Sequence, residues 1–193
     1  VKTQLWVTGG GMPTNSPDEQ RERVIAEANR IRPIAVAASE IGCTVALYNH
    51  GGWFGEPENQ LAIIEELKLA NVGIVYNLHH GHEHIERFRE LLTLIKPHLM
   101  ALNLNGMIPQ GDKLDQKIMP LGAGTLDASL LKTIRESGYT GPVGILNHTD
   151  NDAEARLRDN LDGLDWLLPQ LDGNPATAKP AYRSWTSPVK QSA

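Results

Sequence analysis

Asparagine and histidine recur at the ends of short apolar runs, and both can do chemistry on hydroxylated molecules. Four stretches show the pattern: Val45–His50, Val72–His80, Met100–Asn105 and Val143–His148. Asparagine amides donate to and accept from hydroxyl groups. Imidazole is the side chain whose unperturbed pKa allows proton transfer near neutral pH. The residue types therefore indicate a neutral, polar site with few carboxylates.

The elements that carry these residues read as alternating strands and helices. Each apolar run has the length and β-branched content of a buried parallel strand, and a helix-like segment follows it. Five βα units predict a parallel sheet, either open and doubly wound or part of a barrel. Because the carboxyl ends of parallel strands meet at one edge, we expect the polar residues to converge there. The predicted strands are 5–8, 45–50, 72–77, 100–105 and 143–148.

Helix boundaries follow from local signals. Ser16, with Pro17 next and Glu19 three residues on, predicts a helix start, and Gly42 is suited to a left-handed end. Pro33 predicts a kink in that helix, and Thr125 predicts a later cap. The predicted helices are 16–41, 57–69, 82–96, 125–138 and 152–168, the last with an apolar stripe of Leu157, Leu161, Leu164 and Leu168. We expect His82 and His84 to be exposed at a helix start.

Composition excludes several classes of function. The chain has 193 residues and a net charge of −5, so it offers no basic surface for nucleic acid. The lone Cys43 cannot form an intrachain disulfide, and no run is long enough to span a membrane. No signal peptide is recognised, which makes the cytoplasm the default and leaves the periplasm and secretion open. We expect one domain over 1–170 and an irregular tail over 171–193, with Tyr182 and Trp185 as anchors.

A glycine triplet, Gly9–Gly11, precedes the first long helix and could suggest a phosphate-binding loop. It lacks the Gly-Lys-Ser/Thr ending and the spacing of a dinucleotide site, so no nucleotide cofactor is expected.

Several segments together resemble the C-terminal part of the xylose isomerase-like TIM-barrel family, which contains sugar isomerases and epimerases. Val45–His50 resembles the fifth strand and Asn71–His80 the sixth. Pro120–Asp127 resembles the loop after the seventh strand, and Ser137–Ile145 the entry to the eighth. The resemblance covers about 5–168. It implies a partial (βα) barrel that begins near the fourth strand, with an open edge that needs a missing N-terminal segment or a second copy of the chain.

The resemblance also implies a metal site that this sequence has largely replaced. Family members hold a divalent metal with two Glu, an Asp and a His, and glutamates move the proton. Tyr48, Asn77 and Asn103 stand where the first Glu, the Asp and the His are expected. Leu146 or Asn147 stands at the second Glu, and His80 alone matches the pattern.

Our interpretation is a sugar isomerase, epimerase or related lyase. A noncatalytic carbohydrate-binding or assembly domain that has lost the metal site is the alternative. A divalent metal (Zn, Mn, Co or Mg) is one option, held by His80 with His50, His79 or His148, and a metal-free sugar pocket is the other. The predicted catalytic residues are His80, His50 and His148, and the predicted substrate-binding residues are Tyr48, Asn49, Trp53, Asn77, Asn103, Asn105 and Asn147.

Overall fold

The computed structural model describes residues 2–186 and contains a five-stranded sheet in the order β1-β2-β3-β4-β5. The strands are β1 (Gln4–Val7), β2 (Thr44–Tyr48), β3 (Val72–Asn77), β4 (Leu99–Leu104) and β5 (Val143–Ile145). The α-helices are α1 (Pro17–Glu40), α2 (Gly52–Gly55), α3 (Pro57–Leu67), α4 (Phe88–Ile95), α5 (Asp127–Glu136) and α6 (Ala153–Leu171). The predicted α/β class with a parallel sheet is confirmed.

The chain forms two compact units, which are described separately. The first unit comprises the residues up to Gly81 together with Glu90–Leu102. The second comprises His82–Arg89 and the residues from Asn103 on. Strands β1, β2 and β3 lie in the first unit, and β5 with helices α5 and α6 lies in the second.

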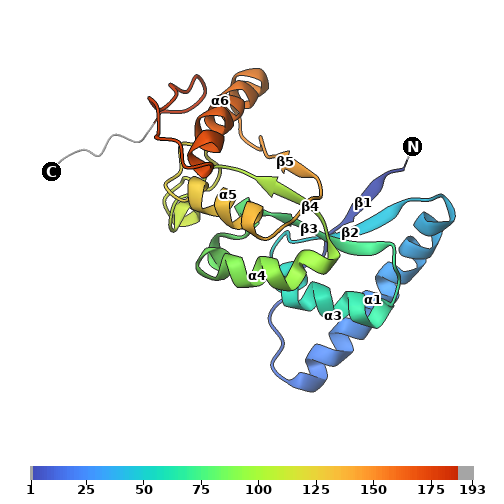
Figure 1. The fold of residues 1–193 in the computed structure, drawn as a ribbon. Helices are drawn as coiled ribbons and strands as arrows, with labels where there is room; N and C mark the ends of the chain where they lie inside the picture. Colours follow the sequence, from blue (N-terminus) through green and yellow to red (C-terminus); the bar gives the residue numbers. More distant parts are fainter. Residues whose placement is uncertain (1, 187–193) are drawn as a thin grey trace. The chain divides into compact units, whose positions relative to one another are not determined.

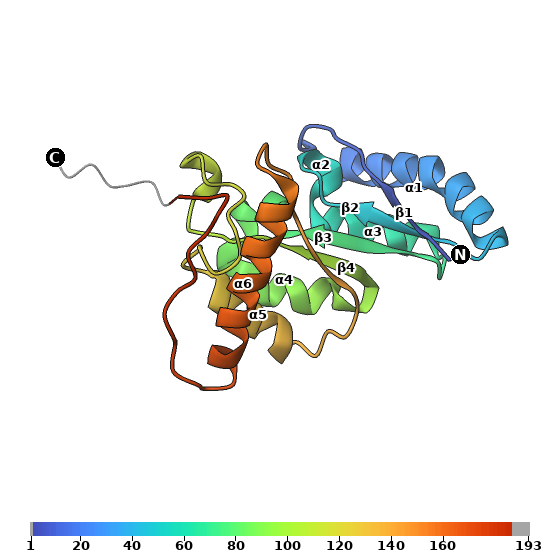
Figure 2. The same cartoon turned by 90° about the horizontal axis from the view of Figure 1, so that it is seen from above.

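In the first unit, α1 and α3 lie side by side and contact β2 and β3 (Figures 1 and 2). Val45 and Leu47 on β2, like Ile74 and Tyr76 on β3, are fully buried. Continuous burial is typical of a parallel strand covered on both faces, and it explains why these runs lack polar alternation. The predicted strand at 72–77 is confirmed at both ends.

The ends of α1 follow the predicted signals. The Ser16 hydroxyl accepts a hydrogen bond from the Glu19 amide at 3.2 Å, which satisfies one of the free N–H groups of the first turn. Gly42 follows the helix with a φ of +71°, a conformation that glycine adopts without strain. The helix continues through Pro33, and the kink there stays a prediction.

Helix α6 of the second unit buries a polar face, contrary to expectation. Its buried residues are Arg156, Asp159, Asn160, Gly163 and Leu167. Within the predicted apolar stripe, Leu157, Leu161 and Leu168 are 43%, 47% and 48% exposed. The polar face is buried because the neighbouring loop and tail need hydrogen-bond partners: the Leu121 amide donates to the Asn160 side chain at 2.9 Å, for example.

Three further expectations about local structure were wrong. Helix α5 begins at Asp127 after Leu126, so Thr125 is not its cap. His82–Arg87 forms a 3-10 helix before α4 rather than the start of an α-helix. His84 is buried, and the His82 side chain is only 5% exposed because its Nε2 lies 2.9 Å from the Lys117 carbonyl oxygen.

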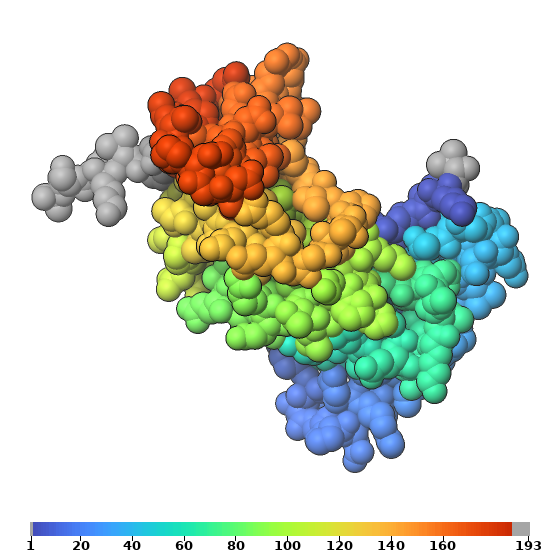
Figure 3. Space-filling model, viewed as in Figure 1, coloured from blue at the N-terminus to red at the C-terminus, as the bar shows by residue number. Residues whose placement is uncertain are grey.

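The segment after α6 belongs to the second unit and is red in Figure 3. Asp159 accepts hydrogen bonds from the backbone amides of Arg183 and Ser184 at 2.8 and 2.7 Å. The Tyr182 hydroxyl donates to the Leu121 carbonyl at 3.1 Å, and its ring contacts Trp185. These contacts anchor the tail as expected. The predicted boundary at residue 170 stays a prediction, and 187–193 lie outside the described residues.

Two remaining observations concern edges and membranes. β1 is the terminal strand of the sheet, so one of its sides has no strand neighbour among residues 2–186. Whether a further segment or a second copy covers it stays a prediction. Over the same residues, none of the helices is long and apolar enough to cross a membrane.

Candidate functional site

Asn49 and Asn77 join the carboxyl ends of β2 and β3 in the first unit. The Asn49 side chain accepts from the Asn77 backbone amide at 2.8 Å and donates to the Asn77 carbonyl at 3.1 Å. Both residues are 1% exposed. Asn49 therefore acts on the backbone of Asn77 in this geometry, and it fixes where the Asn77 side chain lies.

The Asn77 amide in turn positions Tyr48. Its Nδ2 donates to the Tyr48 hydroxyl oxygen at 3.0 Å. Burial raises the pKa of the Tyr48 phenol, and the hydrogen bond from Asn77 opposes that rise. The phenol therefore stays protonated at neutral pH and can donate a proton or a hydrogen bond.

Two imidazole rings lie close to the Tyr48 ring. Its ring centroid lies 5.6 Å from that of His50 and 5.5 Å from that of His80. The two imidazoles are 4.6 Å apart. These residues come from the ends of β2 and β3, so the first unit brings together four of the predicted residues: Tyr48, His50, Asn77 and His80.

Trp6 is a neighbour of this cluster that the sequence analysis missed. Its ring lies 5.7 Å from that of Tyr48, and it is 48% exposed. Trp6 pairs with Ala46 across β1 and β2, which places it on the same face of the sheet as Tyr48 two residues on. The sequence of β1 does not alternate between apolar and polar residues, so only the register between β1 and β2 reveals this contact.

Two further predicted residues of the first unit are buried. His79 lies beside the cluster, and Trp53 lies away from it. His79 is 6% exposed, and its ring centroid lies 3.6 Å from that of His80. Trp53 is 4% exposed, and its indole N–H donates to the Gln20 side chain at 2.6 Å. The Trp53 ring therefore packs between helices rather than forming an open wall.

The other predicted residues belong to the second unit. Asn105 is buried and donates to the carbonyls of Gly106 and Lys117 at 2.9 and 3.2 Å. Asn147 accepts from Asn160 of α6 at 2.8 Å. Asn103 is half-buried on β4, and His148 is exposed in the loop after β5, which ends earlier than predicted.

A fit to a divalent metal fails in the part of the chain that the structure describes. Over residues 2–186, no group of three or more His, Cys, Asp or Glu side chains is arranged to hold a metal ion. The cluster around Tyr48 supplies amide, phenol and imidazole groups, and hard cations prefer carboxylate oxygens. The residues present therefore do not reproduce a metal site.

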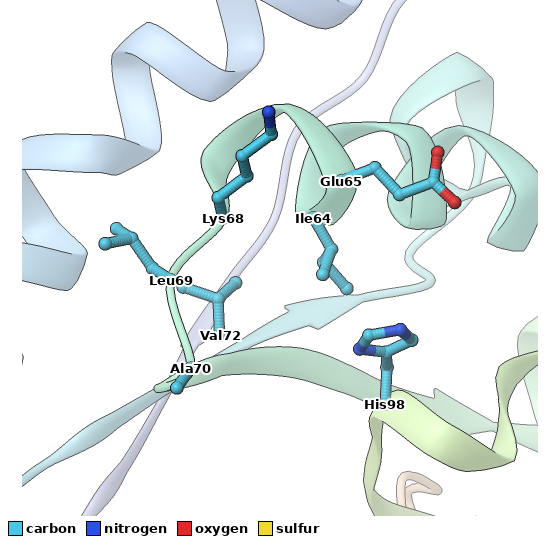
Figure 4. Close-up of a pocket in the computed structure, with 7 residues that line it drawn as sticks. All are labelled: Ile64, Glu65, Lys68, Leu69, Ala70, Val72 and His98. Carbon is cyan, nitrogen blue, oxygen red and sulfur yellow. The ribbon is translucent and has the colours of Figure 1, made fainter.

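A pocket of about 470 Å³ in the first unit lies at the opposite strand ends (Figure 4). It is lined by Ile64, Val72 at the start of β3, and His98 just before β4. Figure 4 shows Lys68 and Glu65 with their charged ends directed away from its centre. Ligands of parallel α/β folds bind at the carboxyl ends of strands, so this pocket is not the candidate site.

Several solved structures have the same fold as this chain. A D-tagatose 3-epimerase-like protein is 19% identical with a TM-score of 0.62, and the match covers 89% of this chain and 62% of that protein. The probable 3-DHS dehydratase AsbF of Bacillus anthracis is 17% identical with a TM-score of 0.66, covering 85% and 63%. The IOLI protein, solved with a zinc atom, is 16% identical with a TM-score of 0.65, covering 84% and 62%.

The chain thus spans about three fifths of the length of these structures. No curated protein sequence matches it. A family model, described as xylose isomerase-like TIM barrel, matches residues 2–169. The parallel sheet is therefore part of a TIM barrel rather than an open doubly wound sheet. The chain belongs to the xylose isomerase-like TIM barrel family.

Proposed function

We propose that this protein isomerises or epimerises a sugar or sugar derivative, or catalyses a related lyase reaction, at the cluster of Tyr48, His50, Asn77 and His80. The single observation that carries the proposal is the approach of two imidazoles to one another and to a phenol, with ring centroids 4.6 to 5.6 Å apart. Such a set contains both a proton acceptor and a proton donor at neutral pH.

The proposed reaction moves a proton on a carbon next to a carbonyl. One imidazole, of His80 or His50, takes the proton from that carbon while the Tyr48 hydroxyl donates its proton to the carbonyl oxygen, which gives an enediol. To complete an isomerisation, the imidazolium gives its proton to the former carbonyl carbon, while the Tyr48 phenolate takes the proton of the hydroxyl group on the first carbon, which becomes the new carbonyl. To complete an epimerisation, the other imidazole, in its protonated form, gives a proton to the opposite face of the first carbon. The Tyr48 phenolate then takes its proton back from the enediol oxygen, and the first imidazolium releases its proton to solvent. The Asn77 amide holds the Tyr48 oxygen at 3.0 Å, so it positions the acid.

The remaining predicted residues are considered unit by unit. In the first unit, Asn49 acts through Asn77, and Trp53, which bonds to Gln20 of α1, has no direct part in the reaction. In the second unit, Asn103, Asn105, Asn147 and His148 remain candidates for binding hydroxyl groups or carrying a proton, separately from the first unit's cluster. The amides of Asn105 and Asn147 already bond to protein groups, so their part would be to accept or share hydrogen bonds.

A divalent metal receives no step in this proposal. The IOLI structure with its zinc atom supports metal binding in a protein of the same fold. In this chain the donor set around Tyr48 is neutral, and His80 with His50, His79 or His148 would be the residues to test. Metal dependence is therefore an experimental variable rather than an assumption.

A noncatalytic carbohydrate-binding domain is the second candidate, and the neutral donor set favours it. Both candidates predict that sugars perturb the NMR signals of His50 and His80, whereas only an enzyme converts the sugars.

We expect turnover of at least one member of a panel of aldoses and ketoses, tested with and without added Zn²⁺ or Mn²⁺, and we expect His80→Gln to lose this turnover. His98→Gln is the control, since His98 lies at the opposite strand ends. Binding without turnover in any condition would favour the second candidate, and no binding would contradict both.

A further inference from the structure

Arg156 in the first turn of α6 has an unusual environment. It is the largest side chain among the fully buried residues, at 1% exposure. Its Nη2 donates to the Ile118 carbonyl oxygen at 2.8 Å. Its Nε and Nη1 atoms, which are also buried, have no hydrogen-bond partner among residues 2–186. A guanidinium group with two unsatisfied nitrogens inside a protein is strongly unfavourable unless an acceptor compensates it.

Up to residue 186, protein groups in the second unit do not supply that acceptor. Asp159, three residues along α6, attracts Arg156 electrostatically. Its carboxylate oxygens, however, receive the hydrogen bonds from Arg183 and Ser184 that anchor the tail. The N-terminal end of α6 is itself already capped, because Asp152 accepts a hydrogen bond from the Ala155 amide and Glu154 lies in the first turn. The buried and incompletely paired guanidinium group of Arg156 is therefore the feature that favours an anion at this place.

Asn105, which bonds to the same loop as Arg156, adds a second unsatisfied polar group. Its amide nitrogen donates to the Lys117 carbonyl, next in sequence to the Ile118 carbonyl that Arg156 contacts. Its Oδ1 atom is buried and has no hydrogen-bond partner in the described part of the chain. Asn105 and Arg156 thus bond to consecutive peptide groups of one loop. Together they leave a charged donor and a neutral acceptor.

We propose that the second unit binds a small hydroxylated molecule through an oxyanion, a carboxylate or a phosphate, held by Arg156. A guanidinium group suits planar or tetrahedral oxyanions because its N–H groups point in fixed directions. Asn105 Oδ1 accepts a hydrogen bond from a hydroxyl group of the same molecule. This inference does not depend on the proposed reaction, because it concerns binding and involves neither His50 nor His80.

Calorimetric titration of the full chain with matched pairs of sugars tests the inference. D-Galacturonate against D-galactose tests a carboxylate, and D-ribose 5-phosphate against D-ribose tests a phosphate. We expect the anionic member of one pair to bind at least about tenfold more tightly than its neutral partner. Equal binding within both pairs, or no binding of any of the four, overturns the inference. Neither result bears on turnover at the first unit's cluster.

Variants of Arg156 test whether this residue causes the preference for the anionic sugar of a pair. Arg156→Gln removes the charge and should reduce the preference to about twofold or less, and Arg156→Lys should weaken it by about threefold or more because the ammonium group lacks the fixed fork. Arg158→Gln is the control: Arg158 is exposed on the same helix and pairs with Glu154. If Arg156→Gln does not fold, the affinity ratio measured for Arg156→Lys decides the test. A preference that survives both Arg156 variants, or that Arg158→Gln also abolishes, contradicts the assignment.

Discussion

Polar side chains are used in different ways by the two units. At the strand ends of the first unit, Asn49, Asn77 and Tyr48 form a short chain of hydrogen bonds that ends in rings, beside His50 and His80. In the second unit, Asp127 and Asp159 are buried and accept hydrogen bonds from loop and tail amides.

This difference indicates which polar groups stabilise the fold and which can take part in a reaction. A carboxylate that holds several backbone amides cannot change its partners without releasing a loop. A phenol or imidazole at the end of a hydrogen-bonded chain can exchange a proton and leave the backbone in place. We therefore expect substitutions of Asp127 and Asp159 to affect mainly stability, and substitutions of the first unit's rings to affect mainly activity.

The largest effect is expected for Asp127→Ala. The Asp127 carboxylate accepts from the amides of Met107, Gly122 and Gly124 at 2.7, 2.7 and 3.0 Å, so its removal leaves three buried donors without an acceptor. The free energy of unfolding should fall by about 4 kcal/mol or more, at about 1–3 kcal/mol for each donor. Urea unfolding monitored by tryptophan fluorescence measures it. A loss below about 1 kcal/mol would mean that the loop does not depend on this residue.

The same carboxyl group predicts a pH dependence. Burial raises the pKa of Asp127 from about 3.8 to about 7, although three amide hydrogen bonds oppose the rise. In the unfolded chain the group loses its proton near pH 4, so between pH 4 and 7 the folded protein binds more protons. The free energy of unfolding should therefore decrease as the pH is raised over that range. Asp127→Asn should show a smaller slope, and an unchanged slope would assign the effect to other groups.

A pair of leucines on α6 sharpens the contrast within one helix. Leu167 is 2% exposed and Leu161 is 47% exposed. Leu167→Ala should cost about 3 kcal/mol, as expected for a buried leucine, whereas Leu161→Ala should change stability by less than about 0.5 kcal/mol. Thermal unfolding of both variants is the measurement. Equal losses would show that the leucine stripe is covered in solution.

A smaller loss of stability is expected for Asn49→Ala in the first unit. The substitution leaves the backbone N–H and C=O of Asn77 without their side-chain partner and should cost about 2 kcal/mol. Because Asn77 positions Tyr48, the activity of Asn49→Ala should fall together with its stability.

Tyr48→Phe, which keeps the ring, should reduce stability by only about 1 kcal/mol but remove the proposed acid. If Tyr48→Phe is as active as the wild type, the comparison between the two units fails.

The fold could be predicted from the sequence where burial alone dictates the pattern. The strand at 72–77 is buried throughout and has no charged residue because both of its faces are covered, and Gly42 marks a helix end because its φ is positive. The leucine spacing of α6 did predict a helix, but not which face it buries. Arg156, Asp159 and Asn160 are buried because of partners in the loop and the tail, which no local pattern reveals.

The grouping of polar residues at the strand ends was predictable for the same reason, whereas their role in a site stays a prediction. Residues at the ends of adjacent strands, such as Tyr48 and Asn77, meet because the strands are parallel and in register. Thr125 was a plausible cap, but the Asp127 carboxylate is used by loop amides, and helix α5 begins later. Trp6 escaped notice because its contact with Tyr48 depends on the register between β1 and β2.

Hydrogen exchange at carbon tests the central claim most directly. The protein is incubated in D₂O with each sugar of the panel, with and without Zn²⁺ or Mn²⁺, and ¹H NMR follows the signals of carbon-bound hydrogens next to the carbonyl or masked carbonyl. We predict that one substrate exchanges such a hydrogen for deuterium with the wild-type protein and His98→Gln, and that His80→Gln and Tyr48→Phe reduce the rate by about 100-fold or more. Exchange that persists in both variants, or its absence for every sugar that binds, would contradict the assignment of proton transfer to this cluster.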